Sequence, residues 1–205
     1  MADNIMGTLP IKRVVVTMSL PIMCSMLISA LYNMVDSVCV AQVGDQEFLA
    51  LSYAYPVQLL MIACCVGLGV GFNATLSKRL GQGDKAAAVT VVHHGLFLYA
   101  VNALIFLAFG LLGAGAFFRM STSDPVVAAL GREYLTICCG MFFGQCLQFF
   151  CERILQCTGN PKGFMIVQGS GAVVNLILDP VLIFGFGMGV RGAAIATVIG
   201  QITGG

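Results

Sequence analysis

The chain has 205 residues, of which 59% are hydrophobic and 9% charged, and its formal net charge is +1. Soluble domains carry about 25% charged residues, so this composition excludes an ordinary water-soluble domain. The near-neutral balance also offers no basic surface for nucleic acid. Several apolar runs exceed the roughly 20 residues that a helix needs to cross a bilayer. The sequence therefore predicts an all-α, polytopic membrane protein.

Charged and turn residues divide the chain into six predicted membrane spans. Glycine or proline lies near every boundary, as expected for turns between helices. The last span holds only about 14 residues, or about 21 Å of helix, which is short of the hydrocarbon thickness. We therefore expect the chain to end inside its last helix, as a fragment would. The predicted spans cover residues 14–43, 48–76, 86–118, 126–156, 164–184 and 192–205.

The distribution of lysine and arginine predicts the orientation of these spans. Cytoplasmic loops of membrane proteins carry an excess of both residues. The side that holds the N-terminus has seven of the ten, and the opposite side has Arg119, Arg132 and Arg191. We therefore predict a multi-pass protein of the cell inner (plasma) membrane with a cytoplasmic N-terminus. The seven residues are Lys12, Arg13, Lys78, Arg79, Lys85, Arg153 and Lys162.

The nine cysteines give no sign of redox or metal chemistry. All of them lie within or at the ends of apolar runs, and none forms a C-x-x-C pair. Buried cysteine behaves as a small hydrophobic residue, and we interpret these thiols in that way. The sequence predicts no cofactor.

Two acidic residues lie deep within predicted spans, Asp36 in the first and Asp179 in the fifth. An aspartate at the centre of a membrane helix costs about 2.5–3.5 kcal/mol on insertion scales, so it is usually retained for function. At 1.5 Å per residue, Asp36 lies about 35 Å from Arg13 and Asp179 about 26 Å from Lys162. Both carboxylates therefore fall in the half of the membrane away from the N-terminus, and we expect them to share one cation site. The alternative is that each is a structural hydrogen-bonding residue.

The sequence around Asp179 favours the cation site. Asn175 precedes it by four residues and shares its helical face. Pro180 follows and cannot donate to the carbonyl of Leu176, so we expect a bend and a free backbone oxygen there. Carboxylates beside free carbonyls are the setting in which transporters bind Na⁺ or protons.

The first and sixth predicted spans contribute further candidates. Tyr32 precedes Asp36 by four residues, and Pro21 predicts a bend in the first span. In the sixth span, the small-residue stretch GAAIAT, residues 192–197, predicts a packing face on which Thr197 is the one hydroxyl.

Four segments together resemble a known family. They are LPIMCSMLISALYNMVDSVCVAQVG in the first span, GLGVGFNATLSKRLGQGDK after the second, QCTGNPK before the fifth, and NLILDPVLIFGFGMGVRGAAIATVIGQ across the last two. They resemble the N-terminal half of a bacterial MATE (multidrug and toxic compound extrusion) transporter of the MepA-like branch. The resemblance implies the six-helix N-lobe of a twelve-helix antiporter that exchanges H⁺ or Na⁺ for cationic, amphipathic drugs. Its other partners would be membrane lipid and the C-terminal lobe, which this chain lacks.

The resemblance also implies roles for individual residues. The cation-coupling network would contain six residues, of which Tyr134 is carried over on spacing alone. A sodium ion would bind at Asp36, Asn175 and Asp179. The first helix would bend at Pro21. The six residues are Tyr32, Asp36, Tyr134, Asn175, Asp179 and Thr197.

Three alternatives stand beside this interpretation. A lipid-linked glycan flippase of the same superfold would need a basic central cavity for its pyrophosphate, whereas the deep charges here are acidic. A non-transporting membrane scaffold is consistent with a truncated chain. An intramembrane enzyme would need a nucleophile with a base or a metal triad, and because the sequence offers neither, we predict a protein that is not an enzyme.

Overall fold

The structure of the protein, a computed structural model, describes residues 10–204. Within that range it leaves out the side chains at positions 11, 14, 18, 29, 32, 33, 36, 40, 161, 162 and 204. Two predicted site residues, Tyr32 and Asp36, therefore lie outside the described side chains.

Helices make up nearly all of residues 10–204, and no strand occurs among them. The all-α prediction is confirmed. The elements are α2 (Ile11–Ala41), α3 (Asp45–Gly81), α4 (Lys85–Ala108), η1 (Phe109–Gly113), α5 (Ala114–Ser121), α6 (Pro125–Gly140), α7 (Phe142–Cys157), α8 (Pro161–Pro180), η2 (Val181–Gly185) and α9 (Val190–Gly204). The two η segments are π-helical and continue α4 and α8.

Short polar side chains fix where several helices begin. Asp84, Asp124 and Asn160 each accept a hydrogen bond from a backbone N–H in the first turn of α4, α6 and α8, at 3.0, 2.8 and 3.0 Å. Such caps satisfy donors that a helix cannot satisfy itself. Pro125 and Pro161 follow two of these caps, where a missing N–H does no harm.

Several helices are suited to crossing a membrane. Among the described residues, Asp45–Gly81, Lys85–Ser121 and Gly163–Gly185 are each long and apolar enough to do so alone. A fourth candidate is the pair α6 and α7, which passes the same test if it counts as one span bent by 44°. Val15–Ile28 and Val190–Thr203 are shorter apolar stretches.

The fourth region differs from the continuous span 126–156 that the sequence predicts. The helix is interrupted at Met141, whose φ and ψ are −104° and 10°. The preceding residue is Gly140, and glycine lowers helix stability by about 1 kcal/mol relative to alanine. α6 and α7 are therefore separate helices within one bent region.

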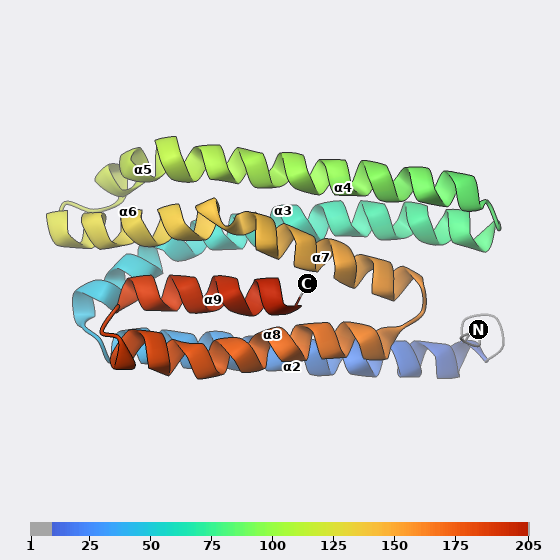
Figure 1. The fold of residues 1–205 in the computed structure, drawn as a ribbon, viewed down its shortest axis with the longest axis horizontal. Helices are drawn as coiled ribbons and strands as arrows, with labels where there is room; N and C mark the ends of the chain where they lie inside the picture. Colours follow the sequence, from blue (N-terminus) through green and yellow to red (C-terminus); the bar gives the residue numbers. More distant parts are fainter. Residues whose placement is uncertain (1–9, 205) are drawn as a thin grey trace.

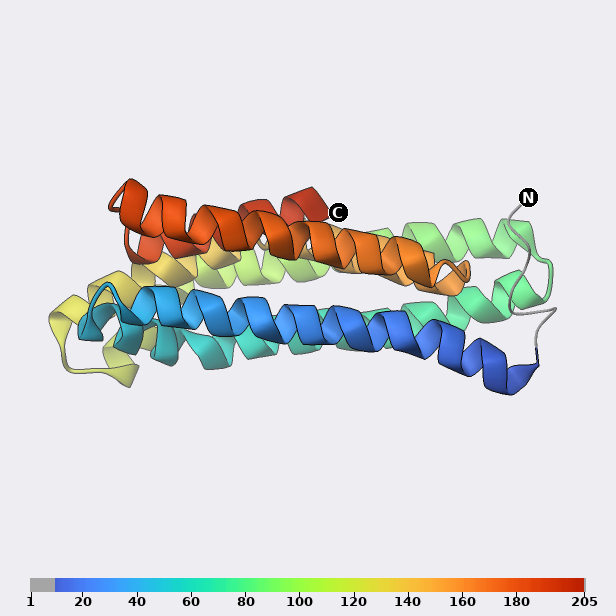
Figure 2. The ribbon, with the colours of Figure 1, turned by 90° about the horizontal axis from the view of Figure 1, so that it is seen from below.

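The helices form an elongated bundle in which α3 and α4 lie on one side and α2 and α8 on the other (Figure 1). The view turned by 90° shows α2 and α8 side by side over most of their length (Figure 2). The turns α3–α4 and α7–α8 lie at the same end as the start of α2, and the turns α2–α3, α5–α6 and α8–α9 lie at the other end (Figure 1). The chain thus alternates between the two ends.

Aromatic packing ties α3, α4 and α7 together. The ring of Phe150 on α7 lies 5.3 Å from that of Phe72 on α3 and 5.8 Å from that of Tyr99 on α4.

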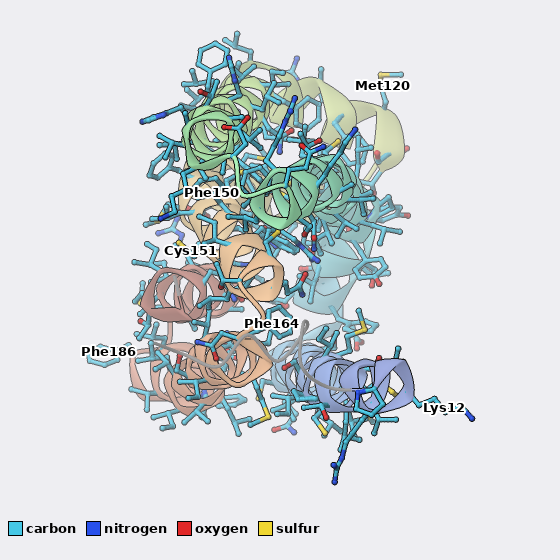
Figure 3. The ribbon with its side chains drawn as sticks, turned by 90° about the vertical axis from the view of Figure 1, so that its right-hand side faces the viewer. Lys12, Met120, Phe150, Cys151, Phe164 and Phe186 are labelled. Carbon is cyan, nitrogen blue, oxygen red and sulfur yellow. The ribbon has the colours of Figure 1, made fainter. Side chains whose placement is uncertain are left out.

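A view along the bundle shows Lys12 and Phe186 pointing away from it on opposite sides (Figure 3). Large apolar side chains on the outer surface of the helices suit contact with lipid rather than water.

Candidate functional site

The predicted pair on α8 forms a buried hydrogen bond. Asp179 is fully buried and Asn175, one turn earlier, is 2% exposed. With its amide oriented to satisfy both ends, the Asn175 nitrogen donates to Asp179 Oδ2 at 3.1 Å. The amide oxygen accepts from the backbone N–H of Thr197 on α9, also at 3.1 Å. The structure thus brings together three of the six predicted coupling residues.

Small residues allow α8 and α9 to approach closely enough for this contact. A Cβ on Gly200 would lie 2.8 Å from the carbonyl oxygen of Gly171 on α8. Ala193 and Ala196 on α9 are fully buried. Close approach of small residues is the usual basis of helix packing in membranes. The hydroxyl of Thr197 donates to its own helix, to the carbonyl of Ala193 at 2.9 Å.

The backbone changes its geometry directly after Asp179. Pro180 is the last residue of α8, and the π-helix Val181–Gly185 follows it. There the N–H of Phe186 bonds to the carbonyl of Val181 at 3.0 Å. Since π-helical turns are frequent at functional sites, the local geometry agrees with a role for the adjacent carboxylate.

The remaining predictions for the first span concern α2, which packs along α8 (Figure 2). Because the side chains of Asp36 and Tyr32 lie outside the description, their part in the site stays a prediction. Pro21 lies inside α2, and the hydroxyl of Ser25 donates to its carbonyl at 2.9 Å.

A cavity of about 330 Å³ opens beside this cluster, between α2, α3, α6, α7 and α9. Tyr134 lies in its wall, and its hydroxyl accepts a hydrogen bond from Gln58 at 2.8 Å. Thr197 also lines the cavity and so connects it to the Asp179 cluster. None of the described lining residues carries a charge. They are Ser37, Phe48, Leu51, Ser52, Tyr55, Gln58, Met61, Ile62, Tyr134, Cys138, Gln145, Thr197, Val198 and Gln201.

A much smaller cavity, about 20 Å³, lies between α7, α8 and α9. Its polar lining includes Gln148, Gln168, Asn175, Thr197 and Gln201. This volume is enough for about one water molecule. Asn175 and Thr197 thus both line the small cavity. Asn175 also contacts Asp179, and Thr197 also lines the large cavity.

Among the described side chains, the structure shows a second buried acid that the sequence did not point to. Glu152 on α7 is 3% exposed, and Gln148 donates to its Oε1 at 3.0 Å. In the sequence, Glu152 lies beside Arg153 near the predicted end of a span and resembles an interfacial residue. Its burial depends on the helices packed around α7, which the local sequence does not indicate.

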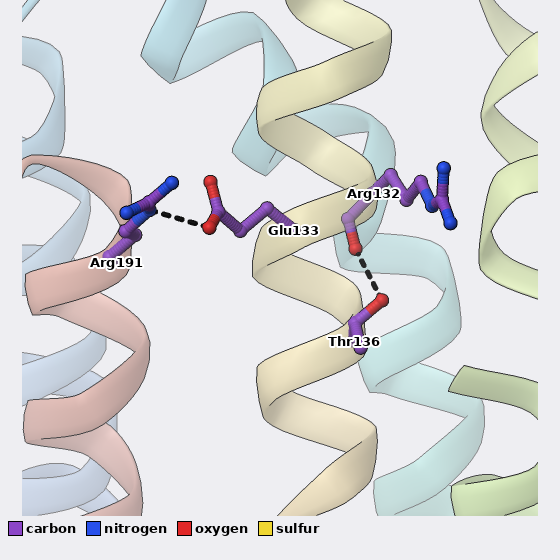
Figure 4. A network of polar contacts seen from close by, with 4 residues as sticks. All are labelled: Arg132, Glu133, Thr136 and Arg191. Carbon is purple, nitrogen blue, oxygen red and sulfur yellow. Dashed lines mark hydrogen bonds and ion pairs between the residues drawn. The ribbon is translucent and has the colours of Figure 1, made fainter. Parts of the chain in front are cut away.

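Charged residues also meet at the end of the bundle where α9 begins. Arg191 Nε pairs with Glu133 Oε1 at 2.5 Å, linking the start of α9 to α6 (Figure 4). On the other face of α6, the hydroxyl of Thr136 donates to the carbonyl of Arg132 at 2.8 Å. Both side chains of the ion pair are substantially exposed, so the pair belongs to the surface rather than to the site.

Comparison with known proteins identifies the family. The profile of the MatE family matches residues 21–181. The chain belongs to the MatE family. The resemblance to MATE transporters noted in the sequence is thereby confirmed.

Two curated relatives show how this MatE chain compares with longer proteins. It is 28% identical over 196 residues to the FAD transporter of Shewanella oneidensis. That alignment covers 92% of this chain and 43% of the transporter. It is also 28% identical over 210 residues to the multidrug export protein MepA of Staphylococcus aureus, covering 94% of this chain and 43% of MepA. The chain thus spans less than half the length of the curated relatives it matches.

A solved MATE structure supports the same fold. A crystal structure of a MATE mutant superposes on this MatE chain with a TM-score of 0.93 at 28% identity. The superposition covers 100% of this chain and 46% of that protein. The helical bundle described above is therefore the arrangement found in about half of a MATE transporter.

Proposed function

We propose that the protein containing this chain is a cation-coupled antiporter that exports drugs and other xenobiotic compounds, mostly cationic and amphipathic. The observation that carries the proposal is the fully buried Asp179, held by Asn175 next to a large uncharged cavity. Ionisable residues at such depth usually mark ion pathways. The similarity to a multidrug export protein supports the same class of substrate.

The coupling ion would bind at the carboxylates. Binding of H⁺ or Na⁺ at Asp179, and at Asp36 on the neighbouring helix, would neutralise charge in a site shielded from water. Asn175 would hold the Asp179 carboxylate in place, and Thr197 would link the site to the cavity. Neutralisation would favour a different bend at Pro21 and shrink the cavity, which releases the drug outward before the transporter resets.

The cavity favours cationic or neutral substrates over phosphate-bearing ones. A relative transports FAD, and a glycan flippase would carry a lipid pyrophosphate. Both substrates contain anionic phosphates, which proteins usually bind with arginine or lysine. The described lining has neither residue, so drug export is the better fit.

The alternation of the turns fits a cytoplasmic N-terminus. Lys78, Arg79 and Lys85 flank the α3–α4 turn, and Arg153 lies near the α7–α8 turn, at the end where α2 begins. The excess of positive charge at this end supports a cytoplasmic position for it at the inner membrane. Asp179 then lies toward the outer side.

The test is ethidium efflux from cells or inverted vesicles that carry the complete gene product containing this chain. We expect Asp179→Asn and Asp36→Asn to abolish efflux, and either a proton ionophore or the removal of sodium to have the same effect on the wild type. Asp45→Asn is the matched control, because Asp45 is exposed in the first turn of α3. Normal efflux from both aspartate mutants would show that the carboxylates are structural. If the wild type moves FAD but never ethidium, the drug substrate is wrong.

A further inference from the structure

Glu152 is a buried carboxyl group that the proposed cation site does not use. It lies about 8 Å from the end of α7, whereas Asp179 lies about 27 Å from the start of α8. Because α7 and α8 meet at one turn (Figure 1), these distances place Glu152 far closer than Asp179 to the α7–α8 end of the bundle. The described part of the chain therefore holds two buried acids at different depths.

A chain of polar contacts runs between these depths. From Glu152, Gln148 is the first contact, with its Nε2 3.0 Å from Glu152 Oε1 and 3.5 Å from Gln168 Oε1 on α8. Gln148 and Gln168 both line the 20 Å³ cavity, and so does Asn175. Asn175 donates to Asp179 at 3.1 Å. The side chain of Gln148 and about one water molecule thus separate Glu152 from the Asp179 cluster.

We propose that Glu152 is a second proton-binding carboxyl of the transporter, reached from the Asp179 site through the small polar cavity. The proposal rests on the proposed function. In the transfer, protonated Asp179 loses a proton and ionised Glu152 gains one. Water carries the proton past the small cavity, whose lining includes Asn175 beside Asp179 and Gln148 beside Glu152. Asp179 is left ionised and Glu152 protonated, and Glu152 then releases the proton to the cytoplasm. Gln148 is a positioning residue that orients Glu152.

The contacts of Glu152 favour a proton over a sodium ion. One carboxylate oxygen already faces the N–H of the Gln148 amide, and a metal ion at that oxygen would meet the positive end of the amide dipole. A proton requires only one free position on the other oxygen. Glu152 can therefore be protonated while its hydrogen bond to Gln148 stays in place.

Three titratable groups interact electrostatically with Glu152, namely Arg153 and Cys151 on α7 and Tyr99 on α4. Arg153 is held by Gln156, with Nη1 2.7 Å from its Oε1. The Tyr99 hydroxyl donates to the carbonyl of Cys65 at 3.1 Å. Arg153 and Tyr99 thus have these other hydrogen-bond partners, and among the described residues Glu152 forms no ion pair with Arg153.

The experiment uses inverted vesicles with the complete gene product, whose cytoplasmic face is open to the buffer. Ethidium uptake is driven by an acidic vesicle interior while the buffer pH is varied, and ethidium exchange is measured separately with equal pH on both sides. Release of the proton is required for net uptake but not for exchange. We expect Glu152→Gln to lower net uptake by roughly 100-fold, to flatten its dependence on buffer pH, and to keep exchange near the wild-type rate.

Companion variants separate the proton site from a structural role. Glu152→Asp keeps a carboxyl group and should restore most net uptake. Gln148→Met removes the amide at similar volume and should weaken net uptake more than exchange. Glu47→Gln, the same substitution at the far end of α3, should match the wild type.

Each outcome bears on the proposal. Selective loss of net uptake in Glu152→Gln supports it. Equal loss of exchange and net uptake, or a dependence on buffer sodium in place of pH, overturns it. If Glu152→Gln does not reach the membrane, Gln148→Met decides instead, and normal net uptake with normal pH dependence in that variant overturns the proposal. If the wild type couples ethidium to protons while Glu152→Gln is normal, only this proposal fails, whereas a wild type that never moves ethidium contradicts the proposed function itself.

Discussion

Asn175 and Asp179 lie one helical turn apart on α8, and the amide nitrogen of one donates to the carboxylate of the other at 3.1 Å inside the bundle. Replacing Asn175 with alanine would leave a buried carboxylate without this donor. A hydrogen bond to a charged group contributes about 1.5–3 kcal/mol. We therefore expect Asn175→Ala to lower the midpoint of thermal unfolding in detergent and to reduce ethidium efflux. Thr203→Ala on the exposed face of α9 is the control, and an unfolding midpoint equal to it would contradict the role of Asn175.

Gly200 sets the distance between α8 and α9, because a Cβ there would lie 2.8 Å from the Gly171 carbonyl and 3.0 Å from Asn175 Cβ. Gly200→Ala should push the helices apart and separate Thr197 from Asn175. We expect a lower unfolding midpoint and weak efflux from this variant.

The matched control for Gly200 is Gly169→Ala. A Cβ on Gly169 of α8 meets nothing within 4 Å. Alanine in a helix is favoured over glycine by about 0.5–1 kcal/mol, so this variant should be unchanged or slightly more stable. If both substitutions had the same effect, the close contact at Gly200 would not control the packing.

The sequence predicts well what depends on local pattern. The long apolar runs specify the helices, and the four-residue spacing of Asn175 and Asp179 predicts that they share a face. Both expectations agree with the structure. The contact of Thr197 with Asn175 could be expected only through the family resemblance, since nothing near Thr197 in the sequence indicates which helix it faces.

Features that depend on packing between distant segments were not predicted. The interruption at Met141 falls in an apolar run without proline. Glu152 reads as an interfacial charge because its burial arises from surrounding helices. Gln148, Gln168 and Gln201 line one cavity from three different helices. Nothing in the sequence near any one of these glutamines indicates that the three lie together.

The ion pair between Glu133 and Arg191 should matter little for stability. Its side chains are 36% and 61% exposed, and exposed pairs contribute at most about 1 kcal/mol. We expect Glu133→Gln to lower the unfolding midpoint slightly at low salt and to match the wild type at high salt, because salt screens surface charges. A large loss of stability that persists in high salt would mean that the pair fixes α9 against α6 in a way that its exposure does not suggest.

Tyr134 offers a way to separate the substrate cavity from the cation site. Its hydroxyl accepts from Gln58 in the cavity wall at 2.8 Å, so Tyr134→Phe leaves Gln58 without that acceptor at a cost of about 1 kcal/mol. We expect the half-saturating concentration of ethidium to rise about fivefold while the dependence on H⁺ or Na⁺ stays unchanged. Tyr53→Phe, on an exposed part of α3 outside the cavity, is the control. If Tyr134→Phe instead changes the ion dependence at constant ethidium affinity, Tyr134 belongs to the coupling network, as the family resemblance implies.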